Sequence, residues 1–191
     1  MGAAMARHTT GRKPYRGPGP ARLPVLGVDV GGVIVRLAGR DEDTSFFGSR
    51  PLETPAVDGV FEALATLTGA TFGGRVHLVS KAGPKVAANT RDWLAHHGFF
   101  ARTGIAAGNV HFVRERRDKA PVCERLGITH FVDDRLDVLA YLESVEHRHL
   151  FLGGGDDGGA GSEHSAAPDV PPWATVTRRW AELATLLAAA R

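Results

Sequence analysis

Short apolar runs that alternate with amphipathic segments constrain the fold of this chain more than any other feature of its sequence. The strongest runs are short and apolar, as strands are when both faces of their sheet are covered; they are Leu23–Val28, Val76–Val79, Ile128–Val132 and His149–Leu152. A weaker run of the same kind spans Val110–Val113. Strands that alternate with helices indicate right-handed crossovers and a parallel sheet. The sequence therefore predicts an α/β fold, a three-layer Rossmann-like sheet with helices on both faces.

The amphipathic segments carry apolar residues at the spacing of one helical face. They are 57–67, 84–98, 136–142 and 180–187. Pro84 is suited to open the second of these helices and Gly98 to close it.

The length of 191 residues is enough for one compact domain with a core, and we expect that domain to span 21–191. Residues 1–20 carry basic side chains among Gly and Pro, so they are expected to form a flexible basic tail. This tail is either solvated or an arm that binds nucleic acid. Residues 153–169 are of low complexity and predict a surface loop.

The composition excludes several classes of protein. Apolar residues make up 43% and charged residues 23%, an ordinary balance for a globular domain. The net charge of +2 gives no support to nucleic acid as a partner. The single cysteine, Cys123, is expected to be a buried apolar residue, and together with the lack of a long apolar segment it suits a cytoplasmic protein without a membrane span.

Polar residues that suit phosphoryl transfer follow the predicted strands. Asp29 comes after the first strand, Ser80 after the second, and the pair Asp133 and Asp134 after the strand that begins at Ile128. Lys119 is placed at the start of the helix that leads into that strand. Ligands of doubly wound sheets bind beyond the carboxyl ends of the strands, so we expect these residues to meet at one site.

Each of these residue types has a physical role in such a site. Carboxylate oxygens of Asp29 and Asp133 suit Mg²⁺, which prefers hard oxygen ligands. A carboxylate can also attack phosphorus, and cations and donors such as Lys119 can stabilise the transferring oxygens. Gly31 and Gly32 would let the backbone approach those oxygens closely.

Taken alone, each residue also has a simpler interpretation. Asp29 can cap a helix, as Asp often does after a strand, and Ser80 can cap the helix that begins at Pro84. Gly31 and Gly32 form neither a phosphate-binding P-loop nor a dinucleotide fingerprint, so ATP or NAD binding is not expected.

The segments LGVDVGGVI at Leu26–Ile34, VHLVSK ending at Lys81, Lys119 itself, and HFVDD ending at Asp134 resemble, in this order, the motifs of the haloacid dehalogenase superfamily. The resemblance implies that Asp29 is the nucleophile and that Ser80 and Lys119 bind the phosphoryl group. It also implies that Asp29, Asp133, Asp134 and the backbone carbonyl of Gly31 organise Mg²⁺. Gly31, Gly32 and Lys81 would complete the substrate-binding set, and the late segment ATVTRRWAEL resembles the last strand and helix of the family.

One position departs from the pattern of the family. Its phosphatases carry a second aspartate two residues after the nucleophile, as general acid and base, and this sequence has Gly31 there. Loss of such a group typically slows a reaction by ~10²- to 10⁴-fold. A good leaving group, another side chain such as His111, Lys81 or Arg135, or a site that binds without turnover would each account for the change.

The spacing of the motifs leaves no room for a large cap domain over the site. The segment 35–55 and a helix fill the chain between Asp29 and Ser80. An open site suits a large phosphorylated substrate, or a small one enclosed by a partner subunit or by the loop Asp41–Arg50. Phe46 and Phe47 of that loop would cover the ligand or pack against the body of the protein.

These features lead to three functional hypotheses. The first is a Mg²⁺-dependent phosphohydrolase that forms an aspartyl-phosphate on Asp29. The second is a catalytically weakened protein that binds a phosphorylated ligand, in which Gly31 marks the lost chemistry. The third is a phosphatase that processes nucleic-acid ends, with the basic tail as a binding arm.

Overall fold

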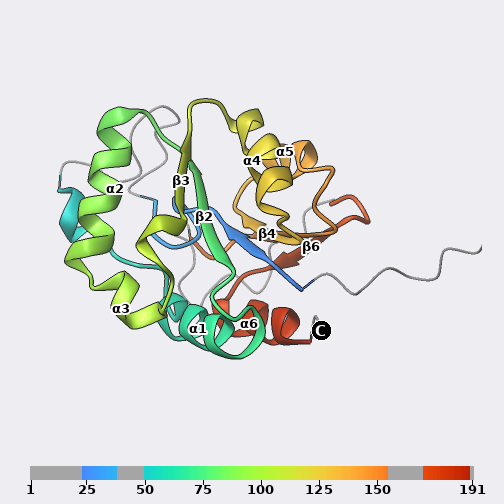
Figure 1. Cartoon of the computed structure of the whole chain (residues 1–191), viewed down its shortest axis with the longest axis horizontal. Coiled ribbons are helices and arrows are strands. Elements are labelled where there is room, and N and C mark those ends of the chain that lie inside the picture. The colour runs from blue at the N-terminus through green and yellow to red at the C-terminus, as the bar shows by residue number, and fades with distance from the viewer. Residues whose placement is uncertain (1–22, 38–49, 155–169, 190–191) are drawn as a thin grey trace, which may run out of the picture.

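A computed structural model describes residues 23–37, 50–154 and 170–189 of the chain, and the account that follows is of these residues. They form one six-stranded sheet in the order β3-β2-β1-β4-β5-β6, in which all five neighbouring pairs are parallel (Figure 1). The strands are β1 (Leu26–Val28), β2 (Val76–Lys81), β3 (Val110–Val113), β4 (His130–Asp133), β5 (His147–Phe151) and β6 (Ala174–Thr177). The predicted parallel α/β fold is confirmed.

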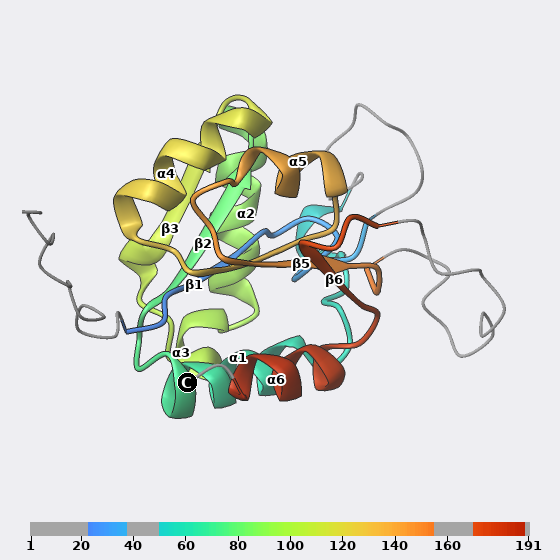
Figure 2. The ribbon, with the colours of Figure 1, turned by 90° about the vertical axis from the view of Figure 1, so that its right-hand side faces the viewer.

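Helices cover both faces of this sheet. They are α1 (Val60–Thr66), α2 (Pro84–His96), α3 (Phe99–Thr103), α4 (Lys119–Leu126), α5 (Leu136–Tyr141) and α6 (Trp180–Ala188). Short turns of 3₁₀-helix are η1 (Pro51–Glu53), η3 (Ala107–Asn109) and η4 (Arg116–Asp118), and a π-helix, η2 (Leu67–Thr71), extends α1. In Figure 2, α4 and α5 lie on one side of the strands and α1, α3 and α6 on the other. The three layers of the prediction are therefore present.

Each face of the sheet has its own hydrophobic core. The larger core joins β1 and β2 to α1, α2, α3 and α6, and the smaller one lies beneath α4 and α5. Buried indole groups tie the larger core to the backbone: Trp180 Nε1 donates to the carbonyl of Val33 at 2.8 Å, and Trp93 Nε1 donates to that of Thr54 at 2.8 Å. The Trp180 bond connects the last helix to the turn that follows β1.

The central strand β1 requires a glycine for close packing. Gly27 lies between its neighbours on β2 and β4, and a methyl group at this position would overlap the ring of Phe131. The Phe131 ring fills the space that the missing side chain leaves, so β1 and β4 stay in register where both reach the functional edge of the sheet.

The predicted elements differ from the structure mainly at their ends. β1 begins at Leu26 rather than Leu23, β5 begins two residues earlier than expected, and α1 begins at Val60 and continues as the π-helix to Thr71. The segment ATVTRRWAEL contains β6 and the start of α6, as the resemblance implied. Helix α3 was not predicted; it lies between Gly98 and Gly104, whose φ angles of 62° and 73° end the flanking helical turns.

Some predictions cannot be compared with the fold. The tail 1–20, most of the loop Asp41–Arg50 with Phe46 and Phe47, and nearly all of 153–169 lie outside the described residues. Among the described residues, the chain between β1 and β3 contains β2, the helices α1, α2 and α3, and short turns. Residues 38–49 of this stretch, on which the expected lack of a cap domain also depends, lie outside the described residues. None of the described helices is both long and apolar enough to cross a membrane.

Candidate active site

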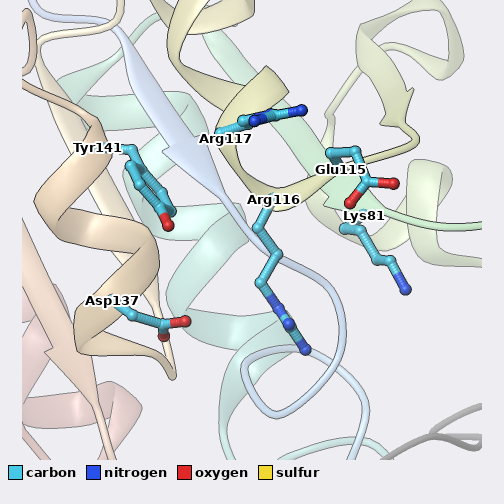
Figure 3. A pocket seen from close by; sticks show the side chains of 6 residues that line it. All are labelled: Lys81, Glu115, Arg116, Arg117, Asp137 and Tyr141. Carbon is cyan, nitrogen blue, oxygen red and sulfur yellow. The ribbon is translucent and has the colours of Figure 1, made fainter.

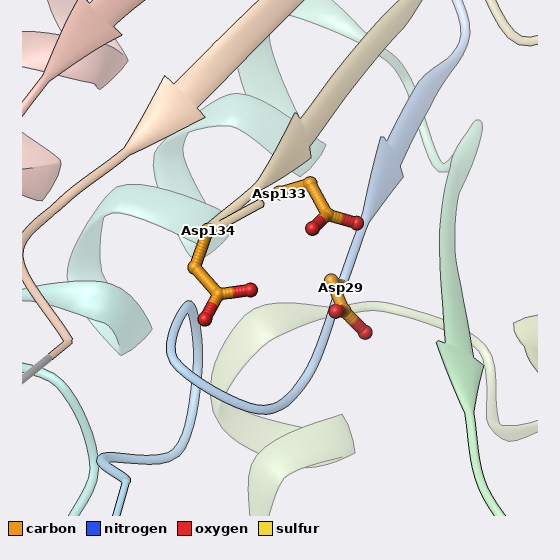
Figure 4. A group of neighbouring side chains, drawn as sticks. All are labelled: Asp29, Asp133 and Asp134. Atoms are coloured by element: carbon orange, nitrogen blue, oxygen red, sulfur yellow. The ribbon is translucent and has the colours of Figure 1, made fainter. Parts of the chain in front are cut away.

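Three carboxylates meet at the carboxyl edge of the central strands. Asp29 follows β1, Asp133 is the last residue of β4, and Asp134 comes next. Val28 pairs with Val132, and the Asp29 amide donates to the Val132 carbonyl at 2.9 Å, so Asp29 and Asp133 leave the sheet side by side. One oxygen from each of the three carboxylates lies within 4.8 Å of the others (Figure 4). The expected convergence of acidic groups from distant parts of the chain is present.

The turn after β1 presents its backbone to this cluster. The amides of Ile34 and Val35 both donate to the Val30 carbonyl at 2.9 Å, and the Gly32 amide donates to Val35 at 2.8 Å. The Gly31 amide has no acceptor among the described residues, so it remains available to a ligand. Gly32 has a φ of 72°, and a methyl group there would overlap the Asp134 carboxylate, which makes glycine necessary for two reasons.

Lys119, from the helix layer that contains α4, contacts two of the three carboxylates. It is the first residue of α4, and its Nζ lies 2.7 Å from Asp133 Oδ2 and 2.9 Å from Asp29 Oδ2. The Lys119 side chain is 1% exposed, so this ammonium is held within the protein. Burial alone would lower the pKa of Lys119, but the charges of Asp29 and Asp133 outweigh it and raise that pKa. Lys119 is therefore a fixed positive charge at this site.

The remaining charge of the cluster is negative. Burial, opposed by Lys119 and reinforced by Asp29, raises the pKa of Asp133 to about 6. Burial and the charges of Asp29 and Asp133 raise the pKa of Asp134 to about 8. Three carboxylates share one ammonium, so the cluster carries more acid than its own cation can balance. A divalent cation with oxygen ligands fits this donor set, and Mg²⁺ is such an ion.

The other predicted ligands lie at the same edge of the sheet. Ser80 lies in β2, two residues beyond the Leu78 that pairs with Val28; its side chain is buried, and its hydroxyl forms no hydrogen bond with another described residue. Lys81 ends β2 and is exposed. Ser80 and Lys81 therefore lie on the neighbouring strand, one and two residues beyond the position level with Asp29.

Two of the side chains considered as replacements for the missing acid have other partners. His111 Nε2 lies 3.2 Å from His77 Nδ1, two residues before the end of β3, and burial lowers the pKa of both rings. Arg135 forms two hydrogen bonds with the carboxylate of Asp137, at 3.0 and 3.2 Å. Lys81, at the carboxyl edge of the sheet, has no such partner among the described residues.

Cys123 is buried in the smaller core, as expected. Burial raises the pKa of its thiol to about 12, so the thiolate is not accessible at neutral pH. A nucleophilic role for this cysteine has no physical basis.

Sequence reasoning missed a cavity between the end of β2, η4 and α5. It measures about 400 Å³ and is lined by Lys81, Glu115, Arg116, Arg117, Asp137 and Tyr141. Arginines next to Lys119 were visible in the sequence, but their convergence with α5 depends on how α4 and α5 pack on the sheet.

Solved structures share the fold of this chain. A D,D-heptose 1,7-bisphosphate phosphatase from Burkholderia thailandensis aligns over 85% of this chain and 96% of its own, with a TM-score of 0.56 and 23% identity. A HAD family hydrolase from Deinococcus radiodurans, solved with bound phosphate and sodium, aligns over 88% and 96%, with a TM-score of 0.58 and 14% identity. The chain has the fold of the haloacid dehalogenase hydrolases.

A haloacid dehalogenase-like hydrolase from Xanthomonas campestris is similar to the same extent, with 14% identity, a TM-score of 0.55 and coverage of 87% and 95%. No protein-family model matches the chain, and no curated protein matches it in sequence. The resemblance noted in the sequence is thus confirmed for the haloacid dehalogenase fold, over most of the chain, and residue roles rest on the geometry of the site.

Proposed function

We propose that this protein is a Mg²⁺-dependent phosphohydrolase that forms an aspartyl-phosphate on Asp29. The observation that carries the proposal is the meeting of Asp29, Asp133 and Asp134 around a buried Lys119 at the carboxyl edge of the sheet. Three carboxylates and one ammonium suit a divalent cation together with a phosphoryl group better than they suit the cation alone or the phosphoryl group alone. The haloacid dehalogenase fold, shared with a sugar bisphosphate phosphatase, supports the same reaction class.

The carboxylates of Asp29, Asp133 and Asp134 and the Gly31 carbonyl would hold Mg²⁺. When bound, the ion would supply positive charge to the phosphoryl oxygens and to the acids. The Gly31 amide, the Ser80 hydroxyl and Lys119 would bind the same phosphoryl oxygens. These groups lie on separate elements, so the rigid sheet sets their relative positions.

The reaction divides into two displacements at phosphorus. A carboxylate oxygen of Asp29 attacks the phosphorus atom, the bond to the alcohol oxygen breaks, and the leaving alkoxide takes up a proton. Water then attacks the phosphorus of the aspartyl-phosphate, gives up a proton, and releases inorganic phosphate and the free carboxylate. Lys119 holds Asp29 in place throughout, because its other partner, Asp133, is completely buried.

Gly31 shapes which substrates such a site can turn over. Without a carboxyl group at this position the leaving oxygen receives no proton from the expected acid, which corresponds to a loss of ~10²- to 10⁴-fold for a poor leaving group. A leaving group that is stable as an anion needs no such proton. The proposal therefore predicts a strong preference for activated phosphate esters and acyl phosphates.

A second candidate is a protein that binds a phosphorylated ligand and does not hydrolyse it. Gly31 favours this candidate, as do the hydrogen bonds that hold Arg135 to Asp137 and the contact between His111 and His77. It differs from the first candidate only in the proton transfer, so the same Mg²⁺ and phosphate site serves both.

The test is phosphate release from acetyl phosphate and p-nitrophenyl phosphate, with Mg²⁺ and with chelator. We expect Asp29→Asn to lower turnover by about 10³-fold or more, because the amide is not a nucleophile. Asp92→Asn, an exposed aspartate of α2, is the matched control and should keep full activity. Full activity of Asp29→Asn would refute the assignment of the nucleophile. Binding of Mg²⁺ and phosphate without turnover of either compound would establish the second candidate instead.

A further inference from the structure

The cavity is built from three elements whose residues adjoin the site residues in the chain. Lys81 is the last residue of β2 and follows Ser80, while Glu115, Arg116 and Arg117 lie at η4, directly before Lys119. Asp137 and Tyr141 come from α5, the helix that begins two residues after Asp134. Figure 3 shows the α5 side chains on one side and those of η4 and Lys81 on the other.

The cavity is connected to the carboxylate cluster through Lys119, which follows its η4 residues in the chain. Lys119 contacts Asp29 at 2.9 Å, and Arg116 precedes Lys119 by one turn of 3₁₀-helix. A rise of about 2 Å per residue places the two backbone positions about 6 Å apart along this turn. Arg116 therefore belongs to the turn that leads directly into the residue that contacts Asp29.

The balance of charge in the cavity favours an anion. Arg135 hydrogen-bonds the carboxylate of Asp137, and its hydrogen bonds and charge, together with the charge of Arg116, hold the pKa of Asp137 below its usual value despite partial burial. Glu115 is the other carboxylate of the lining, against the three cations Lys81, Arg116 and Arg117. Among the described residues, neither Arg116 nor Arg117 has a carboxylate within ion-pair distance. Arg116 is half-buried, so its guanidinium is held near the cavity rather than fully in solvent.

We propose that this cavity binds a second anionic group, a phosphate or a carboxylate, at the far end of a small phosphorylated substrate. The proposal rests on the proposed function, since it places the first phosphoryl group at Asp29. A guanidinium binds both kinds of anion through two parallel hydrogen bonds, and the Lys81 ammonium adds a point charge. The Tyr141 side chain is half-exposed and offers a hydroxyl on the opposite wall. The substrate is therefore a compact molecule with two negatively charged ends.

A matched set of three substrates tests this directly. Propyl phosphate, phosphorylated hydroxypropionate and propanediol bisphosphate share a three-carbon chain and differ only in the far end, which is a methyl group, a carboxylate or a phosphate. All three are alkyl esters with an equally poor leaving group, so Gly31 slows their turnover to the same degree and the comparison reports binding. We expect the wild-type protein with Mg²⁺ to show a KM about ten- to hundredfold lower for at least one of the two doubly charged compounds than for propyl phosphate. The comparison of the two distinguishes a phosphate from a carboxylate site.

Variants assign the effect to the cavity. Arg116→Ala should remove most of the preference while leaving kcat/KM for propyl phosphate unchanged, and Arg116→Lys should restore part of it because it keeps the charge and loses the paired donors. Arg125→Ala removes an exposed arginine near the other end of α4 and is the charge-matched control. An equal loss for all three substrates, or an equal effect of Arg125→Ala, would overturn the proposal.

Binding to Asp29→Asn separates this proposal from the one on catalysis. Calorimetry with this variant and Mg²⁺ measures affinity for the same compounds without turnover. Tighter binding of a doubly charged compound, lost in Asp29→Asn/Arg116→Ala, supports the cavity even if no substrate is hydrolysed. Hydrolysis of propyl phosphate by the wild-type protein with equal affinity for all three compounds would refute the cavity and leave the phosphohydrolase intact.

Discussion

His149 lies buried on the face of the sheet that α1 and α6 cover, and its protonation should make the protein sensitive to acid. The ring is 7% exposed, and neither ring nitrogen has a hydrogen-bond partner in the described part of the chain. Burial, and the charge of the nearby His147, lower the pKa of His149 from 6.5 to about 4. The folded protein therefore holds this ring neutral at pH values where the unfolded chain protonates it.

The sign and size of the effect follow from these two pKa values. Between pH 6.5 and pH 4 the unfolded chain binds more protons than the folded protein, so the free energy of unfolding falls as the pH falls. For one histidine with these values, the loss between pH 8 and pH 5 is about 2 kcal/mol. Asp133 and Asp134, with raised pKa values, act in the opposite direction, and His130, whose pKa burial also lowers to about 4, acts in the same direction as His149. The wild-type curve alone therefore does not isolate His149.

The comparison of wild type with His149→Leu isolates it. Leucine has a similar volume and no polar atoms, so at pH 8 this variant should be at least as stable as wild type, because the unpartnered ring nitrogens are gone. From pH 8 to pH 5 the difference in free energy of unfolding between His149→Leu and wild type should grow by about 2 kcal/mol. The reason is that only the wild type has an imidazole at position 149 that must stay neutral in the folded protein.

Urea unfolding without metal measures this difference, with the buried Trp93 and Trp180 as fluorescent reporters. His96→Leu, which removes an exposed imidazole at the end of α2, serves as control and should follow the wild-type curve. If wild type and His149→Leu lose stability in parallel from pH 8 to pH 5, the reasoning about the buried neutral ring is wrong.

Two further changes test the charge and geometry of the site. Lys119→Met should lower the free energy of unfolding by about 3–5 kcal/mol without metal, because it leaves Asp29 and Asp133 without their cation; a loss below about 1 kcal/mol in urea unfolding would contradict the ion-pair geometry. Gly32→Ala should weaken Mg²⁺ binding about tenfold or more in calorimetry, since the methyl group displaces the Asp134 carboxylate and φ is 72°. Gly69→Ala, where a methyl group meets open space, is the control, and equal Mg²⁺ affinity in both variants would show that Asp134 is not a ligand.

The carboxylate cluster could be predicted from the sequence because each acid is marked by the few residues next to it. Asp29 and Asp133 each follow a run of apolar residues, and the rule that parallel strands end at a common edge brings them together without any knowledge of distances. Lys119 was placed by the same reasoning, as the start of the helix that leads into β4. In the structure its ammonium lies between the two acids, as that position allows.

The features that sequence reasoning missed depend on packing between distant segments. Helix α3 has only five residues, too few to show a helical period, and its place is set by contacts with α1. The buried ring of His149 follows from α6 covering that face of the sheet, and polar residues within a strand do not reveal this. The cavity beside Arg116 requires the spacing between η4 and α5, which only the complete core determines.

The strand order also determines when the protein can acquire its site during synthesis. β1 leaves the ribosome early, but one of its two neighbours in the sheet, β4, follows roughly 100 residues later. At 5–20 residues per second, the nascent chain spends about 5–20 s with one edge of an entirely apolar strand unpaired. Until Asp133 emerges, Asp29 has no acidic neighbour on β4 and the chain cannot complete the carboxylate cluster. During this interval the unpaired edge of β1 is open to association with other chains.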